Sequence, residues 1–317
     1  MLKKIAFVAA LAATAALASP VVAADYPERD VTYIIPFNAG GESDVTARLQ
    51  DAPFRSLTGK GFVIQYQPGA GGAAAWSQLN GLSDDGYTIM GINLPHLFLQ
   101  PMSGQVGYKT EDITVVNVFQ LTPHALLVNA DSPIKTLDDY IAAAKQAPGA
   151  TTVAGTGSNT ANQVAQETFD QAAGITTTYV PFTGTAATTA ALLGNQVSAQ
   201  WGFTTVAVEQ ADKVRMLGVA LDERHPLFPD VPTFKEKGID LVGGAHRGVA
   251  VPKGTPEETR QAISDIFTKI NQDPAFKQKM DEGGYILLDL GYEDMDKFMS
   301  DLGAEYVAVG KALGLVK

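Results

Sequence analysis

Apolar residues occur in short runs along the chain, and glycine-rich turns or helix-like segments separate one run from the next. Short apolar runs bounded by turn formers predict buried strands, and apolar residues at helical spacing predict helices. Strands are expected at 31–35, 62–66, 87–92, 151–154, 176–181, 196–203 and 214–220. Helices are expected at 73–82, 136–146, 160–173, 184–193, 255–271, 274–283 and 292–314, with a short apolar run at 286–290. This alternation predicts parallel sheets covered by helices, an α/β fold.

The stretch 33–48, YIIPFNAGGESDVTAR, joins a strand to a helix through glycine. Pro36 ends the apolar run because it cannot donate the next ladder hydrogen bond, and Gly40-Gly41 allow a tight or left-handed turn. Ser43 and Asp44, both common N-cap residues, then begin a helical pattern. A strand, a glycine turn and a helix N-terminus in this order direct free backbone N–H groups at one point, which favours an anion. The alternative is an ordinary turn between a strand and a helix.

Two long extended stretches, 115–129 and 242–252, lie far apart in the sequence, and each has proline or glycine in or beside it. The first is expected to be interrupted at 122–124. We interpret the two stretches as crossings between domains. The first domain is then discontinuous, 25–124 with 249–317, and the second is 125–248. A cleft between two such halves is a common place for a small-molecule site.

Residues 1–24 have the pattern of a secretory signal peptide. Lys3 and Lys4 precede the uncharged apolar segment 5–17, and small residues at 22–24 offer a cleavage site before Asp25. The alternative is an uncleaved anchor, but the segment is too short to span a bilayer comfortably and no later stretch is suitable. We therefore expect an exported, periplasmic protein. The chain has no cysteine, which excludes a lipoprotein anchor, disulfides and thiolate chemistry.

The charge balance limits the kinds of partner. Without Lys3 and Lys4, 21 of the 23 basic residues remain against 34 acidic ones, a net charge of about −13. This charge argues against nucleic acid or an anionic membrane as the main partner. Any anion site must therefore be local, built from backbone dipoles and one or two cations, because the overall field repels an anion.

The sequence lacks the patterns that organise common catalytic sites. It has no G-x-S-x-G nucleophile turn and no H-E-x-x-H zinc motif, and Gly155-Thr156-Gly157 lacks the third glycine of a dinucleotide turn. We expect a protein that is not an enzyme, with no catalytic residues, no cofactor and no metal.

Five motifs occur in a fixed order: PFNAGGESDVTAR, QPGAGGAAAW, DDGYTIM, FPDVPTF and RGVAVPKGTP. Over essentially the whole chain after residue 24, they resemble the periplasmic solute-binding proteins of tripartite tricarboxylate transporters, the Bug or TctC-type family. The resemblance implies a two-domain periplasmic-binding-protein fold, type II-like, whose cleft closes on an organic acid. It also implies delivery of the ligand to a membrane permease made of a large and a small subunit. We expect a monomer that does not insert into the membrane.

The resemblance also assigns residues to the ligand, because members of this family hold a carboxylate largely through backbone amides and ordered water. The expected ligand-binding set is Asn38, Ala39, Gly40, Gly41 and Asp44 in the first loop, Gly69, Ala70 and Gly71 in the second, Asn93, His96, Ser158, Asn159, Thr160, Thr204 and Arg247. Many members carry an aspartate where this chain has Gly202. We expect the cleft to lack that negative charge and to favour a purely anionic ligand over an amino acid. The adjacent wall candidates are Trp201, Phe203 and Thr204.

Arg247 is the only basic residue in the second crossing stretch, and an arginine can bind a carboxylate through two N–H groups. We favour ligand contact over a structural role at the hinge. Asp44 is interpreted mainly as a helix cap, whereas His96 and His246 could donate to an acid but are more often packed residues. Residues given no ligand role are His124, His225 and Trp76, the last of which is assigned to the core.

The sequence leaves two matters open. A periplasmic sensing module that reports carboxylate occupancy to a sensor kinase would use the same closing clamp, so it remains the alternative function. A four-carbon dicarboxylate, a longer or aromatic diacid and a tricarboxylate all remain possible ligands.

Overall fold

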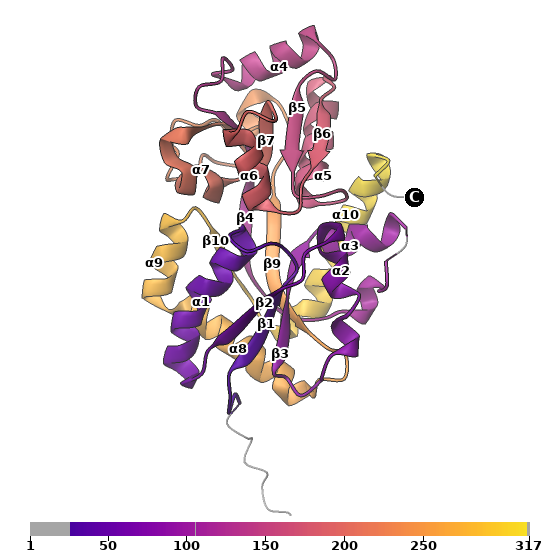
Figure 1. The fold of residues 1–317 in the computed structure, drawn as a ribbon, viewed down its shortest axis with the longest axis vertical. Helices are drawn as coiled ribbons and strands as arrows, with labels where there is room; N and C mark the ends of the chain where they lie inside the picture. The colour runs from indigo at the N-terminus through magenta and orange to yellow at the C-terminus, as the bar shows by residue number, and fades with distance from the viewer. Residues whose placement is uncertain (1–25, 105, 316–317) are drawn as a thin grey trace, which may run out of the picture.

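The computed structural model describes residues 26–104 and 106–315. The expected signal peptide, 1–24, lies outside these residues. The described chain forms two lobes, each built on a sheet flanked by helices (Figure 1). This mixed α/β, two-domain architecture confirms the fold class expected from the sequence.

The lower lobe in Figure 1 contains the first sheet. Strand β1 (Val31–Ile35) lies between β2 (Phe62–Tyr66) and β3 (Thr88–Leu94), and all three are parallel. Strand β9 (Gly244–Val251) is antiparallel to both β3 and β4 (Thr114–Asn129), and β10 (Ile286–Leu290) is antiparallel to β4. The helices of this lobe are α1 (Glu42–Thr58), α2 (Ala73–Trp76), α3 (His96–Met102), α8 (Glu257–Gln272), α9 (Pro274–Glu282) and α10 (Met295–Ala312).

Two apolar cores cover the faces of this sheet. Ile35, Phe119 and Phe267 belong to one core, and Trp76 and Leu97 belong to the other. Trp76 is 1% exposed, which confirms its assignment to the core. Successive residues of a strand point to opposite faces, so a short run such as β1 contributes to both cores.

The upper lobe contains the second sheet, whose strands alternate with helices. Strand β5 (Thr152–Gly155) lies parallel between β6 (Thr178–Pro181) and β7 (Ala199–Phe203), while β7 and β8 (Val214–Val219) each pair antiparallel with β4. The helices are α4 (Leu137–Gln146), α5 (Ala161–Ala173), α6 (Thr185–Leu193) and α7 (Thr204–Gln210). Trp201 is fully buried among Phe169 and Phe234, so it belongs to the core of this lobe.

Strand β4 runs through both lobes (Figure 1). Residues up to Pro123 pair with β9, and residues from His124 pair with β7, so the strand changes partners without the expected interruption at 122–124. Strand β9 pairs along its length with the first sheet. The domain boundaries at 124 and 249 stay a prediction, although this change of partner lies beside the first of them.

Local sequence signals identify some helix ends correctly and others wrongly. Thr136 caps α4 and forms a capping box with Asp139, as the sequence predicts. The prediction that Ser43 or Asp44 caps α1 is wrong, because Gly41 takes that position and makes no side-chain cap. Asp44, two residues inside the helix, instead accepts a hydrogen bond from the N–H of Gly40 at 2.8 Å. Glycine tolerates the extended cap backbone, so the helix begins earlier than the polar pattern indicates.

Three helical segments differ from the sequence prediction. The expected helix 73–82 is only the short α2 followed by a 3₁₀ turn at Leu79–Gly81. Helix α3 is not among the expected helices; Pro101 lies inside it, and Leu97, Phe98 and Leu99 are buried. Helix α7 follows β7 directly, where the β-branched residues TTV mask the helical pattern.

Among the described residues, we find no helix that combines the length and apolarity needed to cross a membrane. In the same part of the chain, no group of three or more histidine, aspartate or glutamate side chains is placed to hold a metal ion.

Candidate ligand-binding site

A narrow pocket of about 10 Å³ lies where the two lobes meet. Its lining comes from both lobes and consists of Phe37, Gly41, Glu42, Ser43, Asn93, His96, Thr156, Thr185, Phe203 and Arg247. Only two of these side chains carry a charge near neutral pH, Glu42 and Arg247. We call this the deep pocket.

A second cavity of about 390 Å³ adjoins the deep pocket, sharing Phe37 and Thr156 with it. The other residues that line it are Gly69, Ala70, Gly71, Gln100, Gly157, Ser158, Pro181, Phe182 and Thr183. Glycine turns from the two lobes therefore face each other across this outer chamber, and it is large enough for a small organic molecule.

Arg247 is the central cation of the deep pocket. Its position in β9 places it between Asn93 of β3 and Gln120 of β4, and it is only 5% exposed. Its Nη1 lies 2.8 Å from Oε1 of Glu42 and donates to Oγ1 of Thr122 at 2.9 Å. The guanidinium carbon lies 5.0 Å from the ring centroid of Phe203 in the opposite lobe, within cation–π range.

The Nη2 group of Arg247 is available to a ligand. It donates no hydrogen bond to any residue in 26–104 or 106–315, and Nε makes only a long contact of 3.4 Å with Oγ of Ser43. A guanidinium presents its donors in a flat fork that matches a carboxylate. The protein thus uses one edge of Arg247 and leaves other donors open.

Glu42 is the anion of the deep pocket and its side chain is 1% exposed. Burial raises the pKa of this carboxyl, and the charge of Arg247 opposes that rise. The hydroxyls of Thr122 and Thr205 lie close enough to lower the pKa as well, but neither makes a well-directed hydrogen bond to Glu42. Glu42 is also the first residue of α1, where the positive end of the helix favours a negative charge.

Three histidines surround this ion pair and are uncharged at neutral pH. Burial, together with the nearby charge of Arg247, lowers the pKa of His96 and of His124 to about 3 and that of His246 to about 4. The His124 ring stacks on Phe203 with ring centroids 5.5 Å apart. Arg247 is therefore the only cationic side chain that lines the deep pocket among the described residues.

Several contacts hold the two lobes together across the cleft. Nε2 of Gln100 donates to the carbonyl of Ser158 at 2.7 Å, and Nδ2 of Asn38 donates to Oγ1 of Thr183 at 2.7 Å. The turns at Gly71 and Gly157 approach so closely that a Cβ on Gly157 would lie 3.4 Å from Cα of Gly71. With these contacts and the small deep pocket, the structure is a closed form.

The structure brings only part of the expected ligand-binding set to the two cavities. Gly41, Asn93, His96 and Arg247 line the deep pocket, and Gly69, Ala70, Gly71 and Ser158 line the outer chamber. The others lie nearby but line neither cavity: Asn38, Ala39, Gly40, Asp44, Asn159, Thr160 and Thr204. No ligand contact is established for any member of the set, so these assignments stay predictions.

The residues outside the cavities have other partners. Thr160 donates to the carbonyl of Gly157, and Thr204 donates to the carbonyl of Gly284 at 2.6 Å. Asp44 accepts from Arg48 and from the hydroxyl of Tyr66, both at 2.8 Å, in addition to Gly40. Its carboxylate is thus occupied by the lower lobe itself.

Sequence reasoning missed several residues that line the cavities. Glu42 and Gln100, which line the deep pocket and the outer chamber, were given no role. His124 was given no role, yet it lies beside Phe203 and Arg247. Thr156 and Thr185 could have been found, since Thr156 lies inside a predicted glycine turn and Thr185 lies at the start of the predicted helix 184–193.

The position of Gly202 does not support the expectation that this residue removes a negative charge from the cleft. A Cβ at this position would lie 2.8 Å from Leu127 and 3.1 Å from Gln200, inside the upper lobe. Gly202 lines neither cavity, so its lack of a carboxylate leaves the charge of the deep pocket unchanged. The carboxylate in that pocket comes from Glu42.

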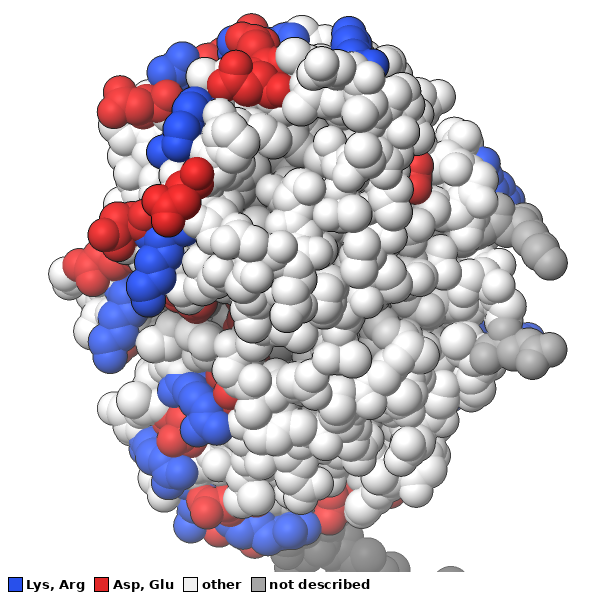
Figure 2. Space-filling model, turned by 45° about the horizontal axis from the view of Figure 1, so that its top comes forward, with Lys and Arg blue, Asp and Glu red and all other residues white. Residues whose placement is uncertain are grey.

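The charged surface residues are unevenly distributed. On the face shown in Figure 2, Lys, Arg, Asp and Glu gather along one flank and at the two ends, and a broad uncharged area lies between them. Exposed charges more than about 10 Å apart are largely screened at ordinary ionic strength. The negative net charge therefore has little influence over this area, and the local groups of the cleft decide what binds.

Known proteins resemble the chain along most of its length. The chain is 29% identical over 314 residues to the UPF0065 protein in gbd 5′region of Cupriavidus necator, which covers 96% of this chain and 95% of that protein. It is 29% identical over 261 residues to protein BugT of Bordetella pertussis, covering 80% of each.

Two solved structures share the fold closely. The periplasmic binding protein BugD matches with a TM-score of 0.84 at 26% identity, over 92% of this chain and 100% of that one. Rpa4515 of R. palustris with adipate matches with a TM-score of 0.87 at 26% identity, over 92% and 99%. A family model, the tripartite tricarboxylate transporter family receptor, matches residues 46–315. This confirms the resemblance found in the motifs, and the chain belongs to the tripartite tricarboxylate transporter receptor family.

Proposed function

We propose that the protein is a periplasmic solute-binding protein that captures a small organic acid between its lobes and delivers it to a membrane permease of the tripartite tricarboxylate type. The observation that carries the proposal is the buried Arg247 guanidinium, which presents unused N–H donors in the deep pocket, beside the outer chamber. The adipate bound to the related R. palustris protein and the family membership support an acid as ligand.

The cleft offers separate places for the two ends of an elongated acid. The deep pocket provides Nη2 of Arg247, and Thr185 at its wall begins α6, whose N-terminal N–H groups face Gly41 across the pocket. The outer chamber provides the turns at Gly69–Gly71 and Gly157. Backbone N–H groups and a guanidinium both favour carboxylate oxygens.

When the two lobes close over the ligand, ligand binding is linked to recognition of the protein by the permease. Contacts such as Gln100 with Ser158 span the two lobes, and a ligand that touches both lobes stabilises the state in which they form. β4 and β9 run side by side where the lobes meet, so they are the natural hinge. The closed form then carries a surface that differs from the open one.

The proposal is tested with the purified mature protein in a thermal-shift screen of di- and tricarboxylates, amino acids and sugars, followed by calorimetric titration. A ligand at a hundred times its dissociation constant stabilises the folded state by about 2.7 kcal/mol, a clear rise in melting temperature. Binding of at least one organic acid is expected. A protein that responds to sugars alone, or to no acid, would overturn the proposal.

Two variants identify the cleft as the place of binding. Arg247→Ala should abolish acid binding, while Arg224→Ala, which removes an exposed arginine of the upper lobe, should leave it unchanged. Gln100→Ala removes a contact between the lobes without a change of charge and should weaken binding, whereas Gln78→Ala, in an exposed side chain, should not. Equal affinity in Arg247→Ala and the wild type would place the ligand elsewhere.

A further inference from the structure

The deep pocket contains a buried carboxylate, which is unexpected in a site for an acid. Within the part of the chain that the structure describes, Glu42 and Arg247 are the only charged side chains that line it, so the two charges cancel before a ligand enters. A ligand end that is only a carboxylate would gain from Arg247 and be repelled by Glu42. Like charges at close range in a buried site are strongly unfavourable.

Several buried polar atoms of this pocket make no well-directed hydrogen bond, although Oε1 of Glu42 lies 2.8 Å from Nη1 of Arg247. Both carboxylate oxygens of Glu42, Oδ1 of Asn93 and Nδ1 of His96 are buried and accept or donate no well-directed hydrogen bond within the described residues. Buried polar atoms in folded proteins nearly always have partners, so a cluster of exceptions in one pocket calls for an absent group. Three of these four atoms, the oxygens of ionised Glu42 and Oδ1 of Asn93, can only accept a hydrogen bond.

The neighbourhood of Glu42 adds no second cation to offset it. His96 is uncharged, since burial lowers its pKa to about 3. Glu209 of α7, partly exposed in the upper lobe, has its pKa raised to about 7, by burial first and then by the charge of Glu42. The acceptors at the Glu42 end of the pocket therefore require a donor that the ligand itself supplies.

We propose that Glu42 is a specificity-determining residue, and that the deep pocket, which has room for about one water in this closed form, widens as the lobes part and takes a carboxylate with an ammonium group on the adjacent carbon, the head of an α-amino acid. The inference rests on the proposed function and names the ligand class of the same site. Nη2 of Arg247 receives the carboxylate, and Glu42 with Oδ1 of Asn93 receives the ammonium. A hydroxyl in place of the ammonium donates one hydrogen bond without charge and is the weaker alternative. The ligand class proposed here therefore differs from the purely anionic ligand that we expected from the lack of a carboxylate at Gly202.

The test compares ligands that differ only at the carbon beside the carboxylate. Succinate, malate and aspartate share a four-carbon diacid skeleton with hydrogen, hydroxyl and ammonium at that carbon, and adipate with 2-aminoadipate repeats the comparison at six carbons. Isothermal titration of the mature protein should show the ammonium compound binding about tenfold or more tightly than its unsubstituted partner, because a hydrogen bond to a charged group is gained. Malate should fall between the other two.

The Glu42→Gln variant distinguishes a role of Glu42 in ligand specificity from a role that only supports Arg247. The variant keeps the shape of the side chain and removes its charge, so the preference for the ammonium compound should fall to near onefold, with the unsubstituted acid bound more tightly than by the wild type. If Glu42 only supported Arg247, all ligands would weaken together and the ratio would not change. The control is Glu236→Gln, in an exposed pair far from the pocket, which should keep the wild-type ratio. If Glu42→Gln does not fold, Glu42→Asp is used instead. It moves the carboxylate back by one methylene group, so the ratio of affinities for the ammonium compound and the unsubstituted acid should fall.

The outcomes distinguish the two proposals. No binding of any acid or amino acid overturns the proposed function. Binding of acids with a wild-type ratio of one or less, or a ratio that Glu42→Gln leaves unchanged, overturns the role of Glu42 and leaves the proposed function standing.

Discussion

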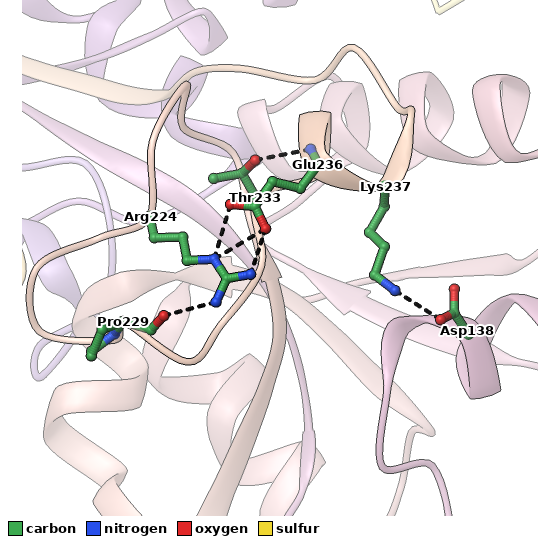
Figure 3. Close-up of polar contacts among 6 residues, drawn as sticks. All are labelled: Asp138, Arg224, Pro229, Thr233, Glu236 and Lys237. Atoms are coloured by element: carbon green, nitrogen blue, oxygen red, sulfur yellow. Dashed lines mark hydrogen bonds and ion pairs between the residues drawn. The ribbon is translucent and has the colours of Figure 1, made fainter.

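The protein contains two arginine–glutamate pairs with opposite properties. At the surface of the upper lobe, Arg224 and Glu236 make a complete set of contacts: Nε lies 2.9 and 3.0 Å from the two carboxylate oxygens, Nη2 lies 2.7 Å from one of them, and Nη1 donates to the carbonyl of Pro229 (Figure 3). In the cleft, Nη1 of Arg247 lies 2.8 Å from Oε1 of Glu42, but neither oxygen of Glu42 accepts a well-directed hydrogen bond within the described residues. The exposed pair is saturated, and the buried pair is not.

This difference indicates what each pair does. Water can satisfy exposed donors and acceptors, so the full geometry of Arg224 with Glu236 adds little to folding. A buried pair has to overcome desolvation and benefits only if its remaining lone pairs and protons are also satisfied. A protein that leaves them unsatisfied beside a cavity keeps binding capacity for a ligand. Incomplete hydrogen bonding of a buried ion pair is therefore a better indicator of a candidate ligand-binding site than the presence of an ion pair alone.

Arg247→Ala should have the largest effect on stability. Removing one partner leaves Glu42 buried without compensation, and the free energy of unfolding should fall by about 3–5 kcal/mol. Denaturant titration by circular dichroism at neutral pH measures this change. A loss no larger than that of Arg224→Ala would mean that Glu42 is not held as a buried charge.

The double variant Glu42→Leu with Arg247→Met should recover most of that loss. Both charges leave together, so no unpaired ion remains, and the free energy of unfolding should return to within about 1 kcal/mol of the wild type. Ligand binding, in contrast, should stay absent in the double variant. Recovery of binding along with stability would contradict the role given to the pair.

The histidines around the buried pair predict sensitivity to acid. The folded-state pKa of His124 is about 3, below the value near 6.5 of an unfolded chain, so its contribution to stability is present above pH 6.5 and is lost as the pH falls toward 3. At pH 5 this one residue should lower the free energy of unfolding by about 2 kcal/mol relative to neutral pH. In the His124→Gln variant, the free energy of unfolding should fall by that much less between neutral pH and pH 5. His225→Gln, in a buried loop residue whose pKa burial also lowers, serves as the control and should reduce that fall by less.

Arg224→Ala should have the smallest effect. The fall in melting temperature should be about 2 °C at most, and it should vanish in high salt, because exposed charges are screened. The effect of Arg247→Ala should be nearly independent of salt. A large, salt-resistant fall in Arg224→Ala would show that the saturated pair stabilises the upper lobe more than its exposure suggests.

Most of the fold could be predicted from the sequence because its signals are local. The strand predicted at 62–66 matches β2, the short apolar run noted at 286–290 forms β10, and the cap at Thr136 is correct, since strand patterns and capping chemistry act within a few residues. Helices α3 and α7 were missed because packing outweighs propensity there: Pro101 lies inside one and a β-branched run begins the other.

The sequence by itself determined the α/β alternation, the glycine turns and the family, and it led to the prediction, still to be tested, that Arg247 anchors an acid. Each of these rests on residues that are neighbours in the chain or on motifs read in order. Only the tertiary structure decided that Glu42 lies against Arg247, that Gly202 turns away from the cleft and that Trp201 is core. Those contacts depend on strand register and on how two lobes close. The physical reason is that the charge balance of a buried pocket is set by residues from opposite ends of the chain, which no local pattern connects.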